Sequence, residues 1–441
     1  MRTRINRFYI LSVLALLGAA SGCVGISYGE DDFRVHRDRL RMGSKLWTLN
    51  AAMLEMPLKP GASVQEYMPG MGQVAAHGAN TVAVDLTGFA DDGRALDPTI
   101  AALVGEVIDK ADDQRMAVII RVFGQELDEG SRSRAATVAG EALKDHGQAI
   151  YWIDGPDAGR LTRYFKRAAP NLVVASAENG DIAVTDVLTD ESANELVLVV
   201  EPTPVPMLED VHFVLDGAPQ TLDALDAAFM NPAEKAPWTP DNSVLSDAER
   251  EAGFIALFNE RNLDGWWIIG TNQNGFAVNE AGEIEWQGLG AKALYTVDRY
   301  DDFILRLEWK INEGGNSGIF LRAPRAARQS KIGMELQLRG DHFDEDNAGD
   351  GNTGAIYSVV PPTENASLPP GEWNELEVLA NGPHIKVTLN DVVVQDVNLD
   401  EYEAGDHRLR EGFLGLQDHS NWVAFRNIRI KTPVARFHVV S

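Results

Sequence analysis

The stretch that decides the fold of the second half of the chain reads Gly315-Asn316-Ser317-Gly318-Ile319-Phe320-Leu321-Arg322, and Gly333-Met334-Glu335-Leu336-Gln337-Leu338-Arg339 follows it. Polar and apolar side chains alternate in both parts. This alternation predicts two β-strands, because successive side chains of a strand point to opposite faces of the sheet. If the two strands are neighbours, Arg322, Glu335 and Gln337 meet on one polar surface.

Two interpretations of this polar surface stay open at this point. An antiparallel sheet often packs one face on a core and turns the other to water, which makes the surface a solvated face. The alternative is a binding or catalytic site. Asn316 and Gly318 at the start of the first strand favour the site, because glycine in a strand often marks the close approach of a ligand or of another backbone.

Composition limits the kinds of function. The chain has 441 residues, of which 44% are hydrophobic and 24% charged, as in folded globular proteins of two or three domains. It carries 39 Lys and Arg against 66 Asp and Glu, a formal charge of −27. A field of this sign repels phosphate backbones, so the composition argues against nucleic-acid binding and favours uncharged or cationic ligands.

Residues 1–22 have the features of a secretory signal. Three arginines precede an apolar run at 10–17 that is too short to span a bilayer. Ala20-Ser21-Gly22-Cys23 then resembles a bacterial lipobox, which predicts lipidation of Cys23. The alternative is a plain secretory signal with an incidental cysteine. Cys23 is the single cysteine of the chain, so the sequence excludes an internal disulfide.

The lipobox interpretation places the protein in a bacterial cell envelope, anchored to a membrane by its lipid. Val24 follows the cysteine in place of an Asp that favours inner-membrane retention, so we expect the outer membrane, at its periplasmic face or its outer surface. Residues 23–37 are the predicted polar tether.

Residues 38–230 alternate between strand-like and helix-like segments. Strands are predicted at 81–85, 116–122, 149–154, 172–176 and 196–201, and helices at 100–112, 135–144 and 161–168. This order indicates an α/β domain with parallel strands and right-handed crossovers. The segment is shorter than the roughly 250 residues of a (β/α)₈ barrel, which predicts a reduced, TIM-barrel-like fold.

Several of these predicted strands end in acidic or polar residues, where barrel enzymes keep catalytic groups. Two suitably spaced carboxylates can hydrolyse a glycoside. The alternative, which so acidic a chain favours, is that these residues simply begin solvated loops. The candidates are Asp85, Gln125, Glu126, Asp154, Glu178 and Glu201.

Residues 231–252 read as a proline-containing linker with a short charged helix, and the composition changes after them. Residues 253–432 predict an all-β domain of two packed antiparallel sheets. Its predicted strands are 282–286, 293–296, 303–311, 317–322, 333–338, 355–359, 374–380, 384–389, 392–397, 412–417 and 423–430. Asn390-Asp391 between two of them predicts a hairpin turn.

An ordered series of motifs gives this domain a resemblance to a known family. The motifs are Leu257-Phe258-Asn259, Leu263-Asp264-Gly265-Trp266, Tyr300-Asp301-Asp302-Phe303, Glu308-Trp309-Lys310, the stretch 315–322, Glu335-Leu336-Gln337, Thr353-Gly354-Ala355-Ile356-Tyr357, Pro370-Gly371-Glu372-Trp373-Asn374, Gly415-Leu416-Gln417-Asp418-His419 and Phe425-Arg426-Asn427-Ile428-Arg429-Ile430. The domain resembles the 3-keto-disaccharide hydrolases, whose fold is a jelly-roll sandwich related to concanavalin-like lectins.

The resemblance implies cleavage of sugars already oxidised to a ketone at carbon 3. Such a site needs a base, an acid for the leaving oxygen and a group that stabilises the enediolate. On this resemblance Glu335 and His419 are the proton-transfer candidates, and Arg322 or a bound divalent metal stabilises the oxyanion. The predicted substrate-binding residues are Asn316, Gln337, Gln417 and Tyr357.

Gln417 and His419 are predicted to share a strand face and to join Arg322, Glu335 and Gln337 there. The acidic run 341–350, with Asp344, Asp346 and Asp350, suggests either a calcium site or a solvated loop, and it lacks the full EF-hand pattern.

Two other functions remain open on the sequence. The same fold hosts lectins, so the domain is alternatively a carbohydrate-binding module without catalysis, or a structural envelope protein. The pattern of Glu335, Gln337, Arg322 and His419 favours an enzyme, because sugar binding alone needs no proton-transfer pair. The predicted partner is a carbohydrate, and the sequence predicts no particular oligomeric state.

Overall fold

The computed structural model describes residues 32–36, 39–42, 45–46, 50–54, 56–185, 197–201, 212–215, 238–269, 275–288, 292–340 and 349–432. The predicted signal segment, Cys23 and most of the predicted tether lie outside these residues. The chain divides into two compact units, residues 1–230 and 231–441, and each is described by itself.

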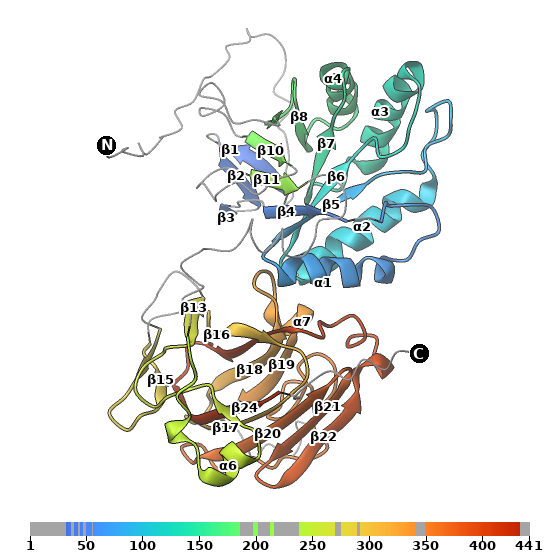
Figure 1. The fold of residues 1–441 in the computed structure, drawn as a ribbon. Helices are drawn as coiled ribbons and strands as arrows, with labels where there is room; N and C mark the ends of the chain where they lie inside the picture. The colour runs from blue at the N-terminus through green and yellow to red at the C-terminus, as the bar shows by residue number, and fades with distance from the viewer. Residues whose placement is uncertain are drawn as a thin grey trace, which may run out of the picture. The chain divides into compact units, whose positions relative to one another are not determined.

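The first unit contains a closed sheet of parallel strands in the order β10-β11-β4-β5-β6-β7-β8-β9 (Figure 1). The strands are β4 (Asn50–Met53), β5 (Thr81–Asp85), β6 (Ala117–Arg121), β7 (Ala149–Ile153), β8 (Val173–Ser176), β9 (Ile182–Thr185), β10 (Val197–Glu201) and β11 (His212–Leu215). A parallel α/β sheet is therefore confirmed for this unit. Its relation to (β/α)₈ barrels stays a prediction.

Helices connect the strands from β4 to β8. They are α1 (Met68–Ala76), α2 (Pro98–Asp113), α3 (Glu129–Leu143) and α4 (Ala158–Ala168). Helix α3 begins six residues before the predicted start, because the Asp128 side chain accepts a hydrogen bond from the Ser131 amide at 3.0 Å and caps the first turn. The sequence pattern missed α1, β4, β9 and β11, which are short or rich in small residues.

Apolar side chains fill the enclosed side of the closed sheet. Ile119, Ile150 and Trp152 alternate along β6 and β7 and pack there. Phe33 and Leu40 join them from a small antiparallel sheet of β1 (Phe33–His36), β2 (Arg39–Met42) and β3 (Lys45–Leu46). The parallel sheet thus has its own apolar core.

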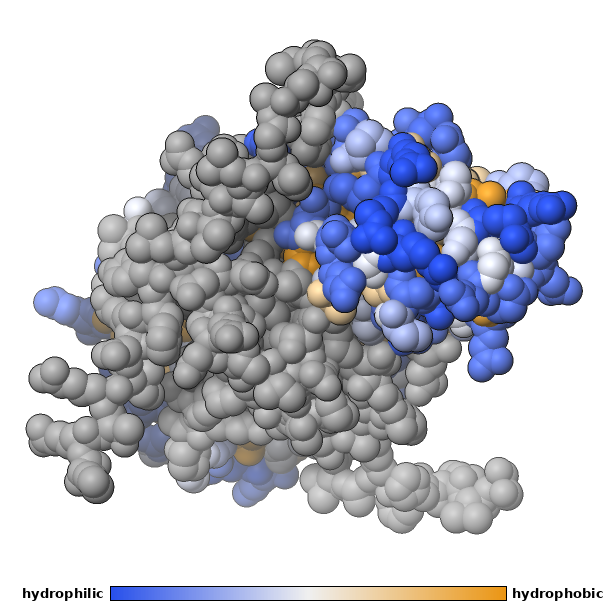
Figure 2. Space-filling view, turned by 90° about the horizontal axis from the view of Figure 1, so that it is seen from above, coloured by the Kyte–Doolittle hydropathy of each residue, from blue (hydrophilic) through white to orange (hydrophobic). Residues whose placement is uncertain are grey.

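The described surface is mostly hydrophilic. Figure 2 shows hydrophilic side chains over most of the coloured area, with hydrophobic ones only in small separate places. Among the described residues, the large hydrophobic side chains that are exposed are Leu368 and Val393. No helix among these residues is long and apolar enough to cross a membrane.

The second unit is an antiparallel β-sandwich, as predicted. One sheet has the order β14-β15-β24-β17-β20-β21-β22, with β12 paired to β24, and the other has the order β13-β16-β23-β18-β19. The strands of the first sheet are β12 (Ile255–Ala256), β14 (Phe276–Val278), β15 (Ile284–Trp286), β17 (Phe303–Ile311), β20 (Asn374–Asn381), β21 (His384–Leu389), β22 (Val392–Asn398) and β24 (Val423–Lys431). Those of the second are β13 (Trp266–Ile269), β16 (Ala293–Tyr300), β18 (Asn316–Ala323), β19 (Met334–Arg339) and β23 (Gly412–Gln417).

The core lies between the two sheets. Strand β17 alternates strictly, with Phe303, Trp309 and the other odd-numbered side chains buried and the even-numbered ones facing out. Asn390 and Asp391 both have positive φ, 48° and 67°, as a two-residue hairpin turn requires, so that turn is confirmed. The predicted strand at 355–359 is wrong, because only Ile356 forms isolated bridges there.

The segment before the sandwich packs onto the second unit from Trp238 on. The Trp238 indole donates to the Asp298 carboxylate at 3.0 Å, and its ring packs against the sandwich core. Helix α6 (Asp247–Glu251) forms where a short helix was predicted. Its N-cap Ser246 and Glu249 make a reciprocal capping box.

Candidate active site

The polar face predicted from the sequence lies on the five-stranded sheet and is buried. Glu335 is 5% exposed and Gln337 3%. Strands β18 and β19 are buried on both faces along almost their whole length. The interpretation as a solvated face is therefore wrong. A buried carboxylate is costly unless it has partners or changes its protonation, so this face needs a further explanation.

Glu335 is held by a neighbouring amide and has an unusual acidity. The Gln417 side chain donates a hydrogen bond to Oε1 of Glu335 at 2.9 Å. Burial raises the pKa of Glu335 to about 7, against smaller lowering effects of this hydrogen bond and of the Arg328 charge. A carboxyl group that titrates near neutral pH is suited to take up and release protons.

The backbone of Gly318 provides the space that this carboxylate occupies. Gly318 lies in β18 opposite Gln337 of β19. A Cβ atom on Gly318 would come within 2.7 Å of Oε1 of Glu335. The glycine in the motif is therefore required by the side chain of the neighbouring strand rather than by its own backbone conformation.

We expect Gly318→Ala to lower activity at least about tenfold, because the new methyl group displaces the Glu335 carboxylate from Gln417. The unfolding free energy should change by no more than about 2 kcal/mol, since the clash is with the Glu335 side chain and not with backbone. Gly351→Ala is the matched control, because a Cβ there meets no atom within 4 Å. Kinetics and urea unfolding of both variants check the prediction, and unchanged activity in Gly318→Ala would contradict it.

The four residues predicted to bind substrate gather around Glu335. The Gln337 amide donates to Oδ1 of Asn316 at 2.6 Å and to the Ser317 carbonyl at 3.2 Å. The backbone amide of Tyr357 donates to the backbone carbonyl of Glu335 at 2.9 Å, which places the Tyr357 backbone beside Glu335. Of the four, Gln417 is the one whose side chain bonds to the Glu335 carboxylate among the described residues.

Arg322 does not join this group, and the prediction that it does is wrong. Its φ is 51°, and the register between β18 and β23 shifts at this point, so Ala323 rather than Arg322 continues the face of Phe320. The guanidinium is fully buried and donates to the carbonyls of Asp301 at 2.7 Å and Gly382 at 2.6 Å. Arg322 therefore ties loops of the sandwich together.

His419 is exposed, and the prediction that it shares a strand face with Gln417 is wrong. Strand β23 ends at Gln417, and His419 lies in the following turn. Asp418 shapes this turn by accepting from the Trp286 indole at 2.9 Å and from the Ser420 amide at 2.7 Å. Among the residues that the structure describes, His419 has no hydrogen-bond partner, and its proposed proton-transfer role stays a prediction.

An aromatic group beside Glu335 was missed by the sequence analysis. Tyr295, Phe320 and Phe413 are buried on the same sheet face, and Tyr295 stacks on Phe413 with ring centroids 5.8 Å apart. The signal was present in the alternation of Ala293 and Tyr295, but the predicted strand ended one residue after Tyr295. Arg328 was missed as well, because nothing in the sequence shows that the β18–β19 loop brings its charge near Glu335.

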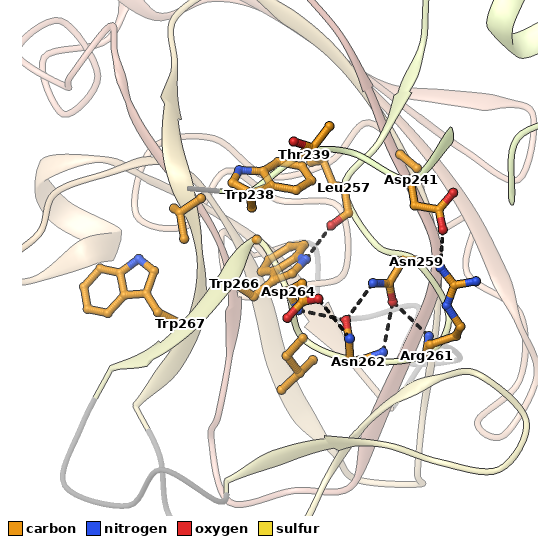
Figure 3. A pocket seen from close by; sticks show the side chains of 14 residues that line it. Trp238, Thr239, Asp241, Leu257, Asn259, Arg261, Asn262, Asp264, Trp266 and Trp267 are labelled. Atoms are coloured by element: carbon orange, nitrogen blue, oxygen red, sulfur yellow. Dashed lines mark hydrogen bonds and ion pairs between the residues drawn. The ribbon is translucent and has the colours of Figure 1, made fainter. Parts of the chain in front are cut away.

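A separate cavity of about 490 Å³ lies around the loop that precedes β13 (Figure 3). Its lining does not include Glu335, Gln337 or Gln417. The polar side chains in it bond to one another: Asn259 donates to Asn262 at 2.6 Å, and Asn262 donates to Asp264 at 2.9 Å. These bonds shape the loop, so we place the candidate site at Glu335 and not in this cavity.

Two of the candidates in the first unit, Asp85 and Gln125, have structural partners. Asp85 forms an ion pair with Arg121 of the neighbouring strand, at 2.5 and 2.8 Å. The Gln125 side chain accepts from the backbone amides of Gly88 and Phe89 at 3.0 Å. Glu201 ends β10, and its side chain lies outside what the structure describes. Their catalytic role stays a prediction.

The described residues contain no group of three or more His, Cys, Asp or Glu side chains that could hold a metal ion. Residues 341–348 of the acidic run lie outside the described part of the chain, and the calcium interpretation stays a prediction there.

Known proteins resemble the second unit. A curated 3-keto-disaccharide hydrolase of Bacteroides thetaiotaomicron is 26% identical over 228 residues, covering 41% of this chain and 78% of the relative. A protein of Parabacteroides distasonis named as a glycosyl hydrolase is 27% identical, covers 43% of this chain and 97% of its own, and has a TM-score of 0.37. The carbohydrate-binding module CBM66 of Bacillus subtilis is 17% identical, covers 38% and 96%, and has a TM-score of 0.29.

The two structural likenesses are weak, so the assignment rests on sequence. Residues 253–431 match the family model of the 3-keto-alpha-glucoside-1,2-lyase-like domain. On this match, residues 253–431 in the C-terminal part of the chain form a domain of the 3-keto-alpha-glucoside-1,2-lyase-like family.

Proposed function

We propose that the second unit cleaves glycosides whose sugar carries a ketone at carbon 3, with Glu335 as the base. One observation carries the proposal: a buried carboxyl group with a pKa near 7 lies among amide side chains on a sheet face. A lectin needs hydrogen-bonding amides but has no use for a carboxyl group tuned in this way. The family of this part of the chain supports the substrate class.

The chemistry follows from the ketone. A carbonyl at carbon 3 acidifies the proton on carbon 2, and ionised Glu335 takes that proton. The C–H electron pair moves into an enolate, whose charge rests on the oxygen of carbon 3. Collapse of the enolate forms the carbon 1–carbon 2 double bond and breaks the anomeric C–O bond, and the leaving oxygen keeps the electron pair and takes a proton. Water then adds its hydroxyl to carbon 1 and a proton to carbon 2.

The amide side chains suit the sugar hydroxyls. Gln337 and Asn316 have donors and acceptors at the same end of the site, and Oε1 of Gln417 is buried without a hydrogen-bond partner among the described residues. An unpartnered buried acceptor is costly, and a sugar hydroxyl that donates to it would remove this cost.

We expect the chain to cleave a 3-keto-glucoside and to leave the unoxidised parent glucoside intact. The value of kcat/KM should rise with pH and level off above about 7, because Glu335 acts in its ionised form. Release of the aglycone, followed between pH 5 and 9 with and without a chelator, tests both points. Loss of activity in the presence of the chelator would show that the reaction requires a bound metal ion. Sugar binding without cleavage would instead identify a lectin-like module.

A further inference from the structure

The hydroxyl group of Tyr295 is buried without a partner. Tyr295 is 0% exposed, and its hydroxyl makes no hydrogen bond within the described residues. The Gln329 side chain approaches it without reaching hydrogen-bond geometry. Such a group costs about 1–3 kcal/mol relative to a satisfied one. Phenylalanine would fill the same space without this cost, so packing does not explain why a tyrosine stands here.

Tyr295 and Glu335 lie in one row across the sheet. Register pairs Tyr295 with Gly415, Gly415 with Phe320, and Phe320 with Glu335. The tyrosine ring lies over Gly415, where an added Cβ would come within 2.6 Å of the ring. The Glu335 carboxylate likewise lies over Gly318. Two positions without side chains thus let both groups lean over the neighbouring strands β23 and β18.

The charge of Glu335 also acts on Tyr295. Burial raises the pKa of Tyr295 above its ordinary value, and the charge of Glu335 raises it further, while Gln329 lowers it. The hydroxyl therefore keeps its proton at any working pH. It cannot act as a base, but it is a permanent hydrogen-bond donor in a buried place.

We propose that the Tyr295 hydroxyl donates a hydrogen bond to the oxygen on carbon 3 of the substrate as Glu335 removes the proton from carbon 2. This inference rests on the proposed function. Carbons 2 and 3 are bonded to each other, so a base at one and a donor at the oxygen of the other must come from the same sheet face. Tyr295 and Glu335 lie in one row on such a face, with Gly415 and Phe320 between them. The charge that develops on this oxygen is what a preorganised donor in a dry site stabilises. Arg322 cannot take this role, because its guanidinium lies away from Glu335.

The test compares Tyr295→Phe with Tyr300→Phe in the full chain. Tyr300 is the matched control, because it lies in the same strand, is 7% exposed and does not belong to the aromatic group beside Glu335. We expect Tyr295→Phe to lower kcat about 10²- to 10³-fold, the usual effect of losing one such donor. Its unfolding midpoint in urea should stay the same or rise, since an unpartnered hydroxyl is removed.

A second measurement separates the role at carbon 3 from a structural role. A 3-keto sugar without an anomeric substituent still exchanges its carbon 2 proton with D₂O, and NMR follows this exchange. We expect Tyr295→Phe to slow exchange and cleavage by similar factors. If Tyr295→Phe exchanged the proton at the normal rate but cleaved slowly, the hydroxyl would act on the leaving oxygen and not on the oxygen of carbon 3. This result would overturn the assignment.

The remaining outcomes distinguish this inference from the proposed function. Unchanged cleavage in Tyr295→Phe, with an active wild type, overturns the inference alone. A wild type that neither exchanges the proton nor cleaves the keto sugar overturns the proposed function, and the inference with it.

Discussion

Replacing Glu335 by glutamine is expected to lower the cleavage rate of a 3-keto-glucoside by about 10²- to 10⁴-fold, the usual contribution of a general base. Glutamine keeps the size of the side chain and can still bond to Gln417, so the site should keep its shape. Residual activity should no longer depend on a group with a pKa near 7. Steady-state kinetics across pH check both parts of the prediction.

The same variant should be more stable than the wild type above pH 7. The pKa of Glu335 is about 7 in the folded protein, against 4.5 for an ordinary glutamate. Between these values the folded state binds more protons than the unfolded state, so the wild type loses stability as pH rises from 4.5 to 7. The loss is on the order of 3 kcal/mol. Glutamine does not titrate, so the stability difference between variant and wild type should grow from pH 5 to pH 8 in urea unfolding.

Glu375→Gln is the control for both measurements, because Glu375 is an exposed carboxylate in the same unit. It should leave the kinetics unchanged and alter stability by less than about 0.5 kcal/mol. If the Glu335→Gln enzyme were active, Glu335 would not be the base. A stability difference that is the same at pH 5 and pH 8 would show that its pKa is ordinary.

Replacing Arg322 by methionine should destabilise the second unit by about 1–3 kcal/mol. The change leaves two half-buried carbonyls, those of Asp301 and Gly382, and the half-exposed Asp302 carboxylate without the guanidinium that bonds to them. Folded Arg322→Met molecules should nevertheless keep their activity within about threefold, because the guanidinium does not face Glu335. Urea unfolding and kinetics per folded molecule measure the two effects separately.

Arg306→Met provides the comparison. Arg306 pairs with Glu377 at the surface, with both side chains 40% exposed, and its loss should cost less than about 1 kcal/mol. Should Arg322→Met fail to fold, Arg322→Lys keeps a cation and is expected to be intermediate in stability. A variant at position 322 that is stable but inactive would show that Arg322 takes part in catalysis.

The sequence predicted most of the sandwich because its strands alternate strictly. The bounds of β17, β21 and β23 agree with the predicted ones, and the Asn390-Asp391 turn lies where expected. Strands β12, β13 and β14 were missed, since each has only two to four residues and too few positions for a period to show.

The candidate site was predicted only where alternation held. Glu335, Gln337 and Gln417 meet because their strands are regular and adjacent. The prediction for Arg322 fails because a register shift in β18 turns its side chain to the other side of the sheet. A sequence pattern with a period of two cannot show such an irregularity. The role proposed for Tyr295 could not be predicted for a different reason, since it depends on an unpartnered hydroxyl that only the folded chain reveals.

The two glycines at positions 318 and 415 give a rule for sorting related sequences. A relative with larger residues at both places can keep every strand of the sandwich, but it has no room for the carboxylate or for the tyrosine ring. We expect such relatives to have lost the keto-sugar chemistry and to survive as binding modules. If the proposed function holds, two small substitutions would therefore be enough to end catalysis, and Glu335 itself need not change.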